Sequence, residues 1–278
     1  AFVKTMPVDS YVALESTDTY HVNFADICYN HNIHVFLTNP RITRRYCEVM
    51  GFRGSNDRIS ALGLSDFIEH QHKRLHEYVP LSSDQRRLRM LVRRRWKVVN
   101  IRTNTSASMH GIKELAREYK AVIDKLNSMI AKIESLIEIQ LHNNADRPRL
   151  ETIPGVGSVV SAVLISDLSI YDFADADAFV AYYGLDTIFS DSGKHKGKRK
   201  LSKRGQRLGR AILYNGAMSA VRTKCWKPIY DKCQERGLSK VQALVIIARK
   251  IARCAWSIYK YKTNFDPNRI NTAAKNAA

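Results

Sequence analysis

The feature that most constrains the fold is a long helical region between Asp84 and Asn144, with a break expected near residues 106–111. Apolar residues recur at helical spacing through its second half, at positions 115, 119, 122, 126, 129, 130, 133, 136, 137 and 141. A stripe of this length predicts either a coiled-coil arm or a helical hairpin. The region therefore divides the chain into three expected parts, which are residues 1–83, 84–147 and 148–278.

The first part has the pattern of an α/β domain. Residues 10–15 and 33–37 are short apolar runs typical of strands, and residues 19–32 between them suit an amphipathic helix. A strand, a helix and a strand at this spacing predict a βαβ unit, for which a parallel sheet is the default. Two more helices are expected at 41–50 and 57–78.

The third part is expected to be all helical. Residues 143–148, Asn-Asn-Ala-Asp-Arg-Pro, are typical of a linker that leads into it. Beyond the linker, the apolar spacing predicts helices at about 158–167, 175–184, 203–223, 227–236 and 239–262, followed by a polar tail from Thr263. The expected fold class is thus α/β followed by all-α.

The charge of the chain indicates a polyanionic partner. Its 278 residues contain 45 Lys and Arg against 26 Asp and Glu, which gives a formal net charge of +19, and 45% of the residues are hydrophobic. Such a chain can bury real cores, and its charge favours nucleic acid over an anionic membrane surface. No apolar run approaches the roughly 18 residues of a membrane span. The five cysteines form no CxxC pair, which argues against a zinc site and indicates a reducing, cytoplasmic compartment.

The densest cationic run follows a serine beside a glycine, Asp191-Ser192-Gly193. A hydroxyl at this place suits attack on a phosphodiester, because the neighbouring cations can stabilise charge that builds on phosphorus. The alternative is a solvated basic loop that holds an ordinary serine. The run contains no Asp or Glu and its cations are Lys194, Lys196, Lys198, Arg199, Lys200, Lys203, Arg204, Arg207 and Arg210.

A second basic segment opens the long helical region. Its cations include Arg86, Arg87, Arg93, Arg94 and Arg95, with Asp84 as the only nearby acid. A charge run on a helix is usually a solvated face, but this density favours a face that contacts phosphates.

Residues 152–157, Thr-Ile-Pro-Gly-Val-Gly, resemble the turn of a helix-hairpin-helix. Gly155 and Gly157 would let the turn approach a phosphate closely, and the helix that follows would offer its N-terminal amides. The alternative is a plain turn between two helices. In a chain this basic, we expect contact with a DNA or RNA backbone.

Two acids in the first part are candidate metal ligands. Glu15 closes the first strand, at the edge where open α/β sheets place their sites. Asp57 begins a later helix, and position 60, which would share its helix face, is Ser60. Carboxylates here would suit Mg²⁺.

Several motifs in one order carry a family resemblance. They are residues 12–20, 35–40 and 56–61 in the first part, and 153–157, 179–185, 192–193, 201–205, 208–214 and 265–267 in the third. On these residues the chain resembles the DEDD-type insertion-sequence transposases, which include Piv-like DNA invertases and bridge-RNA-guided recombinases.

The resemblance implies a RuvC-like, RNase H-type domain joined by a coiled coil to a helical transposase domain, with both domains composing one site. Four acids would bind Mg²⁺, and Ser192 would attack DNA to form a 5′-phosphoserine link. The second and third acids of the family fall on Glu15 and Asp57, but the fourth falls on Ser60 and the first has no counterpart before Ala1. The chain is accordingly expected to be a fragment or a decayed copy, or to rely on another chain for chemistry.

The resemblance therefore predicts a DNA transposase or recombinase, associated with the prokaryotic nucleoid, with a guide RNA and a dimeric or tetrameric assembly. One alternative is a catalytically inactive, truncated relative that retains DNA or RNA binding. Another is a purely structural helical DNA binder in which Ser192 is incidental.

Overall fold

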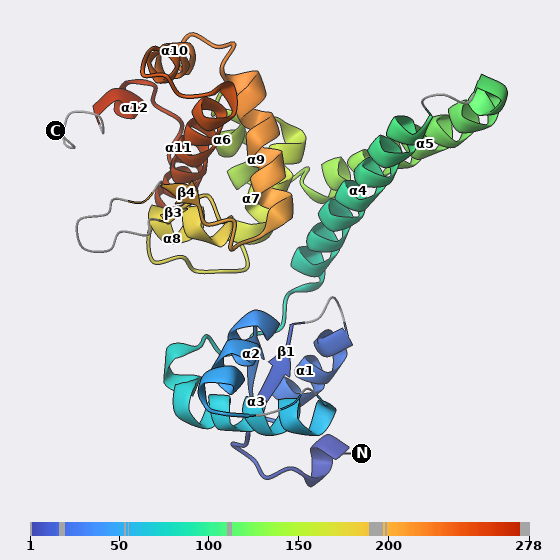
Figure 1. The fold of residues 1–278 in the computed structure, drawn as a ribbon, viewed down its shortest axis with the longest axis vertical. Coiled ribbons are helices and arrows are strands. Elements are labelled where there is room, and N and C mark those ends of the chain that lie inside the picture. Colours follow the sequence, from blue (N-terminus) through green and yellow to red (C-terminus); the bar gives the residue numbers. More distant parts are fainter. Residues whose placement is uncertain are drawn as a thin grey trace. The chain divides into compact units, whose positions relative to one another are not determined.

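The computed structural model describes residues 2–16, 20–52, 54, 56–109, 113–188, 197 and 199–272. The chain divides into two compact units, Ala1–Ser82 and Ser83–Ala278 (Figure 1). Helices dominate the described residues, with one small parallel sheet and one small antiparallel sheet. This composition agrees with the predicted combination of an α/β part and a helical part.

A parallel sheet in the first unit confirms the predicted strand–helix–strand arrangement. β1 (Tyr11–Glu15) pairs in parallel with β2 (His34–Thr38), and Glu15 lies opposite Thr38 at the end of the register. α1 (Tyr20–Asn30) connects the two strands, and a short 3-10 helix, η1 (Phe2–Thr5), precedes them. One small buried cluster of this unit consists of Val3, Ala25, Cys28, Ile33 and Val35.

Two asparagine caps begin the remaining helices of the first unit. Asn39 accepts a hydrogen bond from the Arg41 amide at the start of α2 (Pro40–Val49), and Asn56 accepts one from the Ile59 amide at the start of α3 (Asp57–Gln71). Because these side chains satisfy otherwise unpaired N–H groups, they fix where the helices begin.

The predicted helix over 57–78 is too long. α3 ends at Gln71, and a short 3-10 helix, η2 (His72–Arg74), follows it. The chain then becomes extended, and the Tyr78 amide donates to the Val35 carbonyl at 2.7 Å beside a bridge between Phe36 and Glu77. Backbone groups near Tyr78 therefore form hydrogen bonds with the edge of β2 and not the bonds of a longer helix.

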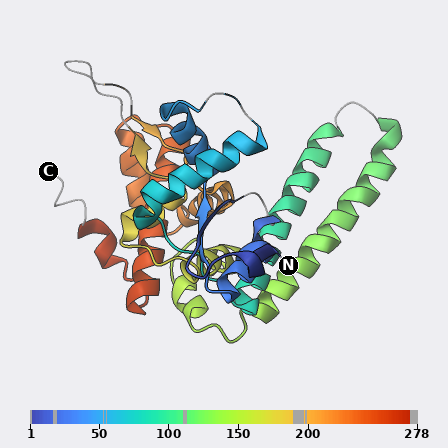
Figure 2. The same cartoon turned by 90° about the horizontal axis from the view of Figure 1, so that it is seen from below.

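The second unit begins with two long helices, α4 (Ser83–Ser108) and α5 (Ala116–Gln140), which lie side by side as a helical hairpin (Figures 1 and 2). A 3-10 turn, η3 (Lys113–Leu115), precedes α5. Buried residues at helical spacing, such as Leu91 on α4 and Ile137 on α5, make the hairpin's contact with the main core. Of the two alternatives for the apolar stripe, the structure shows the hairpin.

The rest of the second unit is a bundle around a large apolar core. α7 is buried from Val160 to Leu168, and α11 packs against α8 and α9. The largest fully buried side chains include Trp226, Tyr183 and Phe179. The helices are α6 (Asp146–Glu151), α7 (Ser158–Leu168), α8 (Ala176–Tyr182), α9 (Arg207–Ala220), α10 (Lys227–Glu235), α11 (Lys240–Tyr261) and α12 (Asn268–Thr272).

The predicted linker at 143–148 is only partly correct, because α6 begins inside it. The Asn144 side chain accepts hydrogen bonds from the amides of Asp146 and Arg147, at 3.0 and 3.2 Å. Pro148 then falls in the first turn of a helix, where the missing N–H has no partner to lose. The turn-forming residues of the expected linker therefore start a helix.

A short antiparallel hairpin joins α8 to α9, and the sequence had not predicted it. β3 (Thr187–Ile188) pairs with β4 (Lys200–Leu201). The hairpin closes the segment between Ile188 and Lys200, most of which lies outside the described residues. No helix in the described part of the chain is long and apolar enough to cross a membrane.

Candidate nucleic-acid interface

The serine predicted as nucleophile and three of its cations lie outside the described residues, at Ser192, Lys194, Lys196 and Lys198. What the structure defines is the base of the segment that carries them. The Ser202 hydroxyl donates to the Asp186 carboxylate, and the Ser202 amide donates to the Asp186 carbonyl at 2.9 Å. The two ends of the segment are therefore tied together directly beside β3 and β4.

Cations gather on the chain that returns from this segment. Arg199, Lys200, Lys203, Arg204 and Arg207 are exposed, as a phosphate-binding surface requires. Arg210 differs, because its guanidinium donates to the Tyr183 carbonyl at 2.8 Å and is half-buried. Burial and the neighbouring Arg207 lower the pKa of Arg210. In the described structure Arg210 thus fixes the backbone at Tyr183, directly after α8.

The start of α9 meets the basic segment of α4. The guanidinium of Arg207 lies over the ring of Trp96, 5.9 Å from its centre. Trp96 itself packs on the main core of the unit, so its position is fixed. Two basic segments that are far apart in the sequence therefore meet at this contact.

On α4 the cations predicted to bind nucleic acid divide into two kinds. Arg87 and Arg94 are exposed, whereas Arg86 and Arg93 are half-buried. Burial and the nearby Arg89 lower the pKa of Arg93. Arg95 is engaged within the hairpin, where its Nη2 lies 2.6 Å from the Glu134 carboxylate of α5.

The two glycines of the predicted hairpin occupy different surroundings. Gly155 has φ +95° and faces α9, where an added Cβ would lie 2.5 Å from the Gly216 carbonyl oxygen and 2.6 Å from the Ala220 Cβ. Gly157 has no atom within 4 Å of an added Cβ and directly precedes α7. Glycine at 155 is thus required by packing, and the open position is 157.

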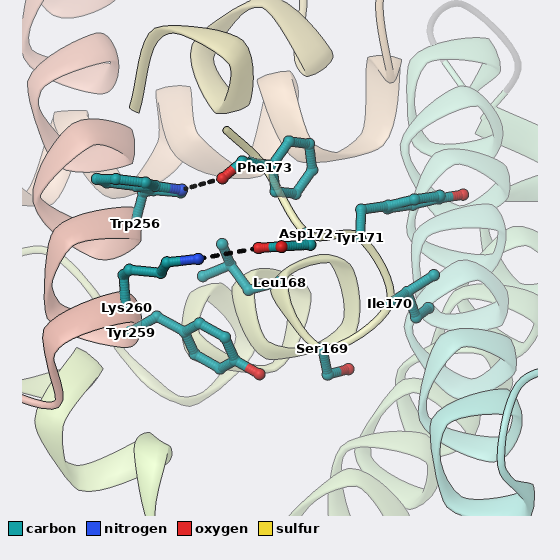
Figure 3. A pocket seen from close by; sticks show the side chains of 9 residues that line it. All are labelled: Leu168, Ser169, Ile170, Tyr171, Asp172, Phe173, Trp256, Tyr259 and Lys260. Atoms are coloured by element: carbon teal, nitrogen blue, oxygen red, sulfur yellow. Dashed lines mark hydrogen bonds and ion pairs between the residues drawn. The ribbon is translucent and has the colours of Figure 1, made fainter. Parts of the chain in front are cut away.

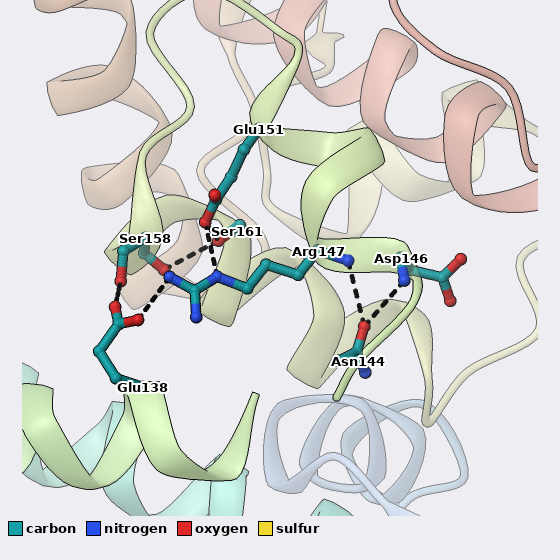
Figure 4. Close-up of polar contacts among 7 residues, drawn as sticks. All are labelled: Glu138, Asn144, Asp146, Arg147, Glu151, Ser158 and Ser161. Atoms are coloured by element: carbon teal, nitrogen blue, oxygen red, sulfur yellow. Dashed lines mark hydrogen bonds and ion pairs between the residues drawn. The ribbon is translucent and has the colours of Figure 1, made fainter. Parts of the chain in front are cut away.

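A polar network joins the turn to α5 and α6 (Figure 4). Arg147 bonds to Glu151 at 2.9 Å and to Glu138 at 2.5 Å, and Glu138 also accepts from the Ser158 hydroxyl at the start of α7. The Ser161 hydroxyl donates to Glu151 at 2.8 Å. The first turn of α7 therefore already has a carboxylate beside it.

We expect this network to make the stability of the second unit depend on acid pH. The Ser158 hydroxyl first, and Arg147 second, lower the pKa of Glu138. The ionised form is thus favoured in the folded state, so the contribution is present above the unfolded pKa and lost as pH falls through the folded pKa. Urea unfolding should show a steeper loss of stability below about pH 4 for the wild type than for Glu138→Gln. Because Glu138 is half exposed, the difference at pH 7 should stay under about 1 kcal/mol; parallel pH curves would contradict this role.

The acidic candidates of the first unit form only part of a metal site. Glu15 is half-buried at the end of β1 and accepts from the Thr43 hydroxyl at 3.3 Å, whereas Asp57 and Ser60 are exposed on the first turn of α3. Among the described residues no group of three or more His, Cys, Asp or Glu side chains is placed to hold a metal ion. Carboxylate and hydroxyl oxygens suit Mg²⁺, but these donors do not fit the full four-acid site that the resemblance implies.

One pocket of the second unit had no counterpart in the sequence analysis (Figure 3). It encloses about 250 Å³ beside α11 and is walled by aromatic rings, among them Trp256 and Phe173. The Trp256 indole donates to the Phe173 carbonyl at 3.3 Å, and Lys260 pairs with Asp172 at 3.0 Å. The sequence could not predict this pocket, because its walls come from the loop after α7 and the end of α11, which are far apart along the chain.

Comparison with known proteins identifies the class of this chain. Residues 4–116 match a family model described as a transposase, of the DEDD type of IS110, and residues 147–231 match the model of the IS116/IS110/IS902 transposase family. A chain with both matches in this order has the make-up of a transposase, a class that acts in DNA transposition or recombination. Both matches are similarities to transposases of the IS110 group, and the DEDD-type match suggests a divalent metal.

Relatives support the same assignment over most of the chain. The pilin gene-inverting proteins of Moraxella bovis and Moraxella lacunata are each 24% identical over 268 residues, which cover 92% of this chain and 82% of the relative. A probable family 20 transposase of Pseudomonas aeruginosa is 29% identical over 159 residues, or 55% of this chain and 47% of the relative. The predicted resemblance to insertion-sequence transposases and Piv-like invertases thus agrees with both family matches and with these relatives.

Proposed function

We propose that this chain binds DNA along the cationic surface of its second unit and cuts and rejoins strands through the hydroxyl of Ser192. The observation that carries the proposal is the contact of Arg207 with Trp96, which brings the basic start of α9 against α4, the helix that carries the second basic segment. That surface adjoins the base of the segment to which Ser192 belongs. The transposase family matches supply the class of substrate.

The chemistry is a transesterification. The Ser192 oxygen forms a bond to a backbone phosphorus, the bond from phosphorus to the 3′ oxygen breaks, and the DNA keeps its 5′ phosphate on the serine. The serine proton passes to solvent and the released 3′ oxygen takes one up. Exposed cations such as Arg199, Lys200 and Arg204 stabilise the charge that develops on the phosphate oxygens. Because one phosphate ester replaces another, the reverse reaction with a different 3′ hydroxyl rejoins the DNA.

No step of this chemistry is assigned to Mg²⁺, because the donors among the described residues of the first unit do not fit a complete two-metal site. We further propose, on the resemblance, that the first unit is RuvC-like, that residues 152–157 act as a helix-hairpin-helix, and that a guide RNA selects the DNA. Two or four copies would act together, since recombination joins two duplexes. The mass of the complex with DNA, measured by light scattering, tests the last point.

A second candidate function is nucleic-acid binding without strand cleavage. Ser60 favours it, because a hydroxyl stands where the resemblance requires a fourth carboxylate. Loss of one ligand at a two-metal site changes both charge and geometry. This function predicts binding that weakens steeply with salt and no cleaved product either with or without Mg²⁺.

A trap for a covalent protein–DNA adduct separates the two functions. The chain is incubated with candidate target DNA, with and without Mg²⁺ and total native RNA, and run on a denaturing gel. We expect an adduct with the wild type, none with Ser192→Ala and an unchanged amount with Ser190→Ala, the matched control two residues away.

An adduct that persists in Ser192→Ala would refute the role of this serine. If no variant forms an adduct while tight DNA binding remains, the second function holds. An adduct that forms equally well in EDTA would show that the incomplete acidic set is not needed for cleavage.

A further inference from the structure

A buried carboxylate in α7 has no part in the chemistry proposed above. Asp167 is 2% exposed and lies in a buried stretch of α7 whose other residues are apolar apart from Ser161 and Ser166. Burying an ionisable group is costly unless hydrogen bonds compensate, so its partners indicate what it is for. Burial raises the pKa of Asp167, and hydrogen bonds and the nearby Arg89 oppose that rise.

Three donors converge on this carboxylate. Tyr183 donates its hydroxyl at 2.9 Å, Tyr182 donates its hydroxyl at 3.2 Å, and the Gln206 side-chain amide donates at 3.2 Å. The Gln206 amide also lies 3.3 Å from the Tyr182 hydroxyl. Burial and the neighbouring Asp167 raise the pKa of both tyrosines, which therefore remain protonated donors.

These partners stand at the two ends of one segment. Tyr182 and Tyr183 end α8 and lead into β3, whereas Gln206 follows β4 and caps α9 by accepting from the Gly209 amide. The main chain closes the same junction, since the Gln206 amide donates to the Tyr182 carbonyl at 2.8 Å. The Lys203 amide likewise donates to the Gly184 carbonyl at 3.1 Å.

The two chain ends are closely packed at this junction. Gly205 lies so close to the backbone of Tyr182 and Gly184 that any Cβ would overlap it, and Gly209 lies in the same way against the Tyr183 ring. Arg210 adds a side-chain bond to the Tyr183 carbonyl. One carboxylate in the core thus fixes both the outgoing and the returning chain of the 188–200 segment.

We propose that Asp167 is a positioning residue, which holds the two ends of the Ser192 segment in register so that the nucleophile meets the phosphate. The proposal rests on the function proposed for Ser192. Asp167 acts through Tyr182, Tyr183 and Gln206 and contacts no substrate. A core that needed only to be stable could hold an apolar residue here, because replacing buried polar groups by apolar ones of similar shape is often neutral.

The test uses Asp167→Asn, which keeps the volume but replaces one acceptor oxygen with a donor. Tyr183→Phe removes one hydroxyl and keeps the ring. Tyr214→Phe on α9 is the matched control, because its hydroxyl makes no hydrogen bond within the described residues. Amide hydrogen exchange, DNA affinity and the rate of adduct formation are measured on the full chain.

We expect Asp167→Asn and Tyr183→Phe to speed exchange at the Lys203 and Gln206 amides by about tenfold, as loss of a buried hydrogen bond implies. Exchange within α11 and the DNA affinity should stay unchanged, while the adduct rate falls. Tyr214→Phe should match the wild type in all measurements.

Unchanged exchange at Lys203 and Gln206 in both variants would overturn the proposal. So would a general loss of protection that includes α11, because it would mark a purely structural residue. If the wild type forms no adduct, the function proposed for Ser192 fails, and the exchange measurement still decides whether Asp167 holds the segment ends.

Discussion

Replacing Gly155 with alanine is expected to destabilise the second unit by about 3 kcal/mol, whereas alanine at Gly157 should change its stability little. At φ +95° a residue with a Cβ costs about 1–2 kcal/mol. The added methyl group would also meet the Gly216 carbonyl and Ala220 on α9, and overpacking of this kind costs about 1–3 kcal/mol. Gly157 has an ordinary φ of −98° and open space beside it.

Tryptophan fluorescence during urea unfolding measures the stability of the second unit. All three tryptophans, Trp96, Trp226 and Trp256, belong to the second unit. Trp226 also reports on the turn itself, because its indole donates to the Pro154 carbonyl at 3.0 Å. Equal midpoints for Gly155→Ala and Gly157→Ala would show that the turn does not pack on α9 as described.

The same pair of variants separates packing from phosphate contact. At a temperature where both remain folded, Gly157→Ala changes only the open position of the turn. A weaker affinity of Gly157→Ala for DNA would support contact between the turn and the backbone. An unchanged affinity would leave packing against α9 as the reason for the glycine at 155.

The parts of the fold that the sequence predicts are those set by local pattern. Short apolar runs on either side of a helix predict the parallel pair of strands, and helical spacing of apolar residues predicts the bundle helices, because burial sets both patterns. Local pattern does not predict where an element ends if a segment distant in the sequence forms hydrogen bonds with its backbone groups. Residues near Tyr78 leave the helix to pair with β2, and Asn144 starts a helix where polar residues indicated a linker.

The candidate site likewise has features that the sequence predicts and features that only the folded chain shows. Charge density predicts the two basic segments, but only the folded chain joins them through Arg207 and Trp96. Sequence also cannot separate exposed cations from Arg95, which pairs with Glu134. Asp167 escapes detection because its donors lie 15, 16 and 39 residues away.

Removing four exposed cations from the chain that returns from the Ser192 segment should weaken DNA binding by roughly 10²- to 10³-fold near 100 mM salt. The variant combines Lys200→Gln, Lys203→Gln, Arg204→Gln and Arg207→Gln, all of which are exposed between β4 and the start of α9. Each lost phosphate contact removes about 0.9 from the slope of log affinity against log salt concentration, because fewer counterions are released. The slope should therefore fall by about 3 to 4 units, measured by fluorescence anisotropy on one duplex across a salt series.

Two controls show whether the loss belongs to this surface. Four exposed cations on α5, changed by Arg117→Gln, Lys120→Gln, Lys125→Gln and Lys132→Gln, remove the same charge from another face. The change Arg95→Gln removes a cation from α4 whose guanidinium already pairs with a carboxylate, so it should lower stability and leave the slope unchanged. An equal fall in slope for the α5 variant would mean that DNA senses only net charge. A fall confined to the variant of residues 200–207 would locate the bound phosphates beside the segment that carries Ser192, as the proposed chemistry requires.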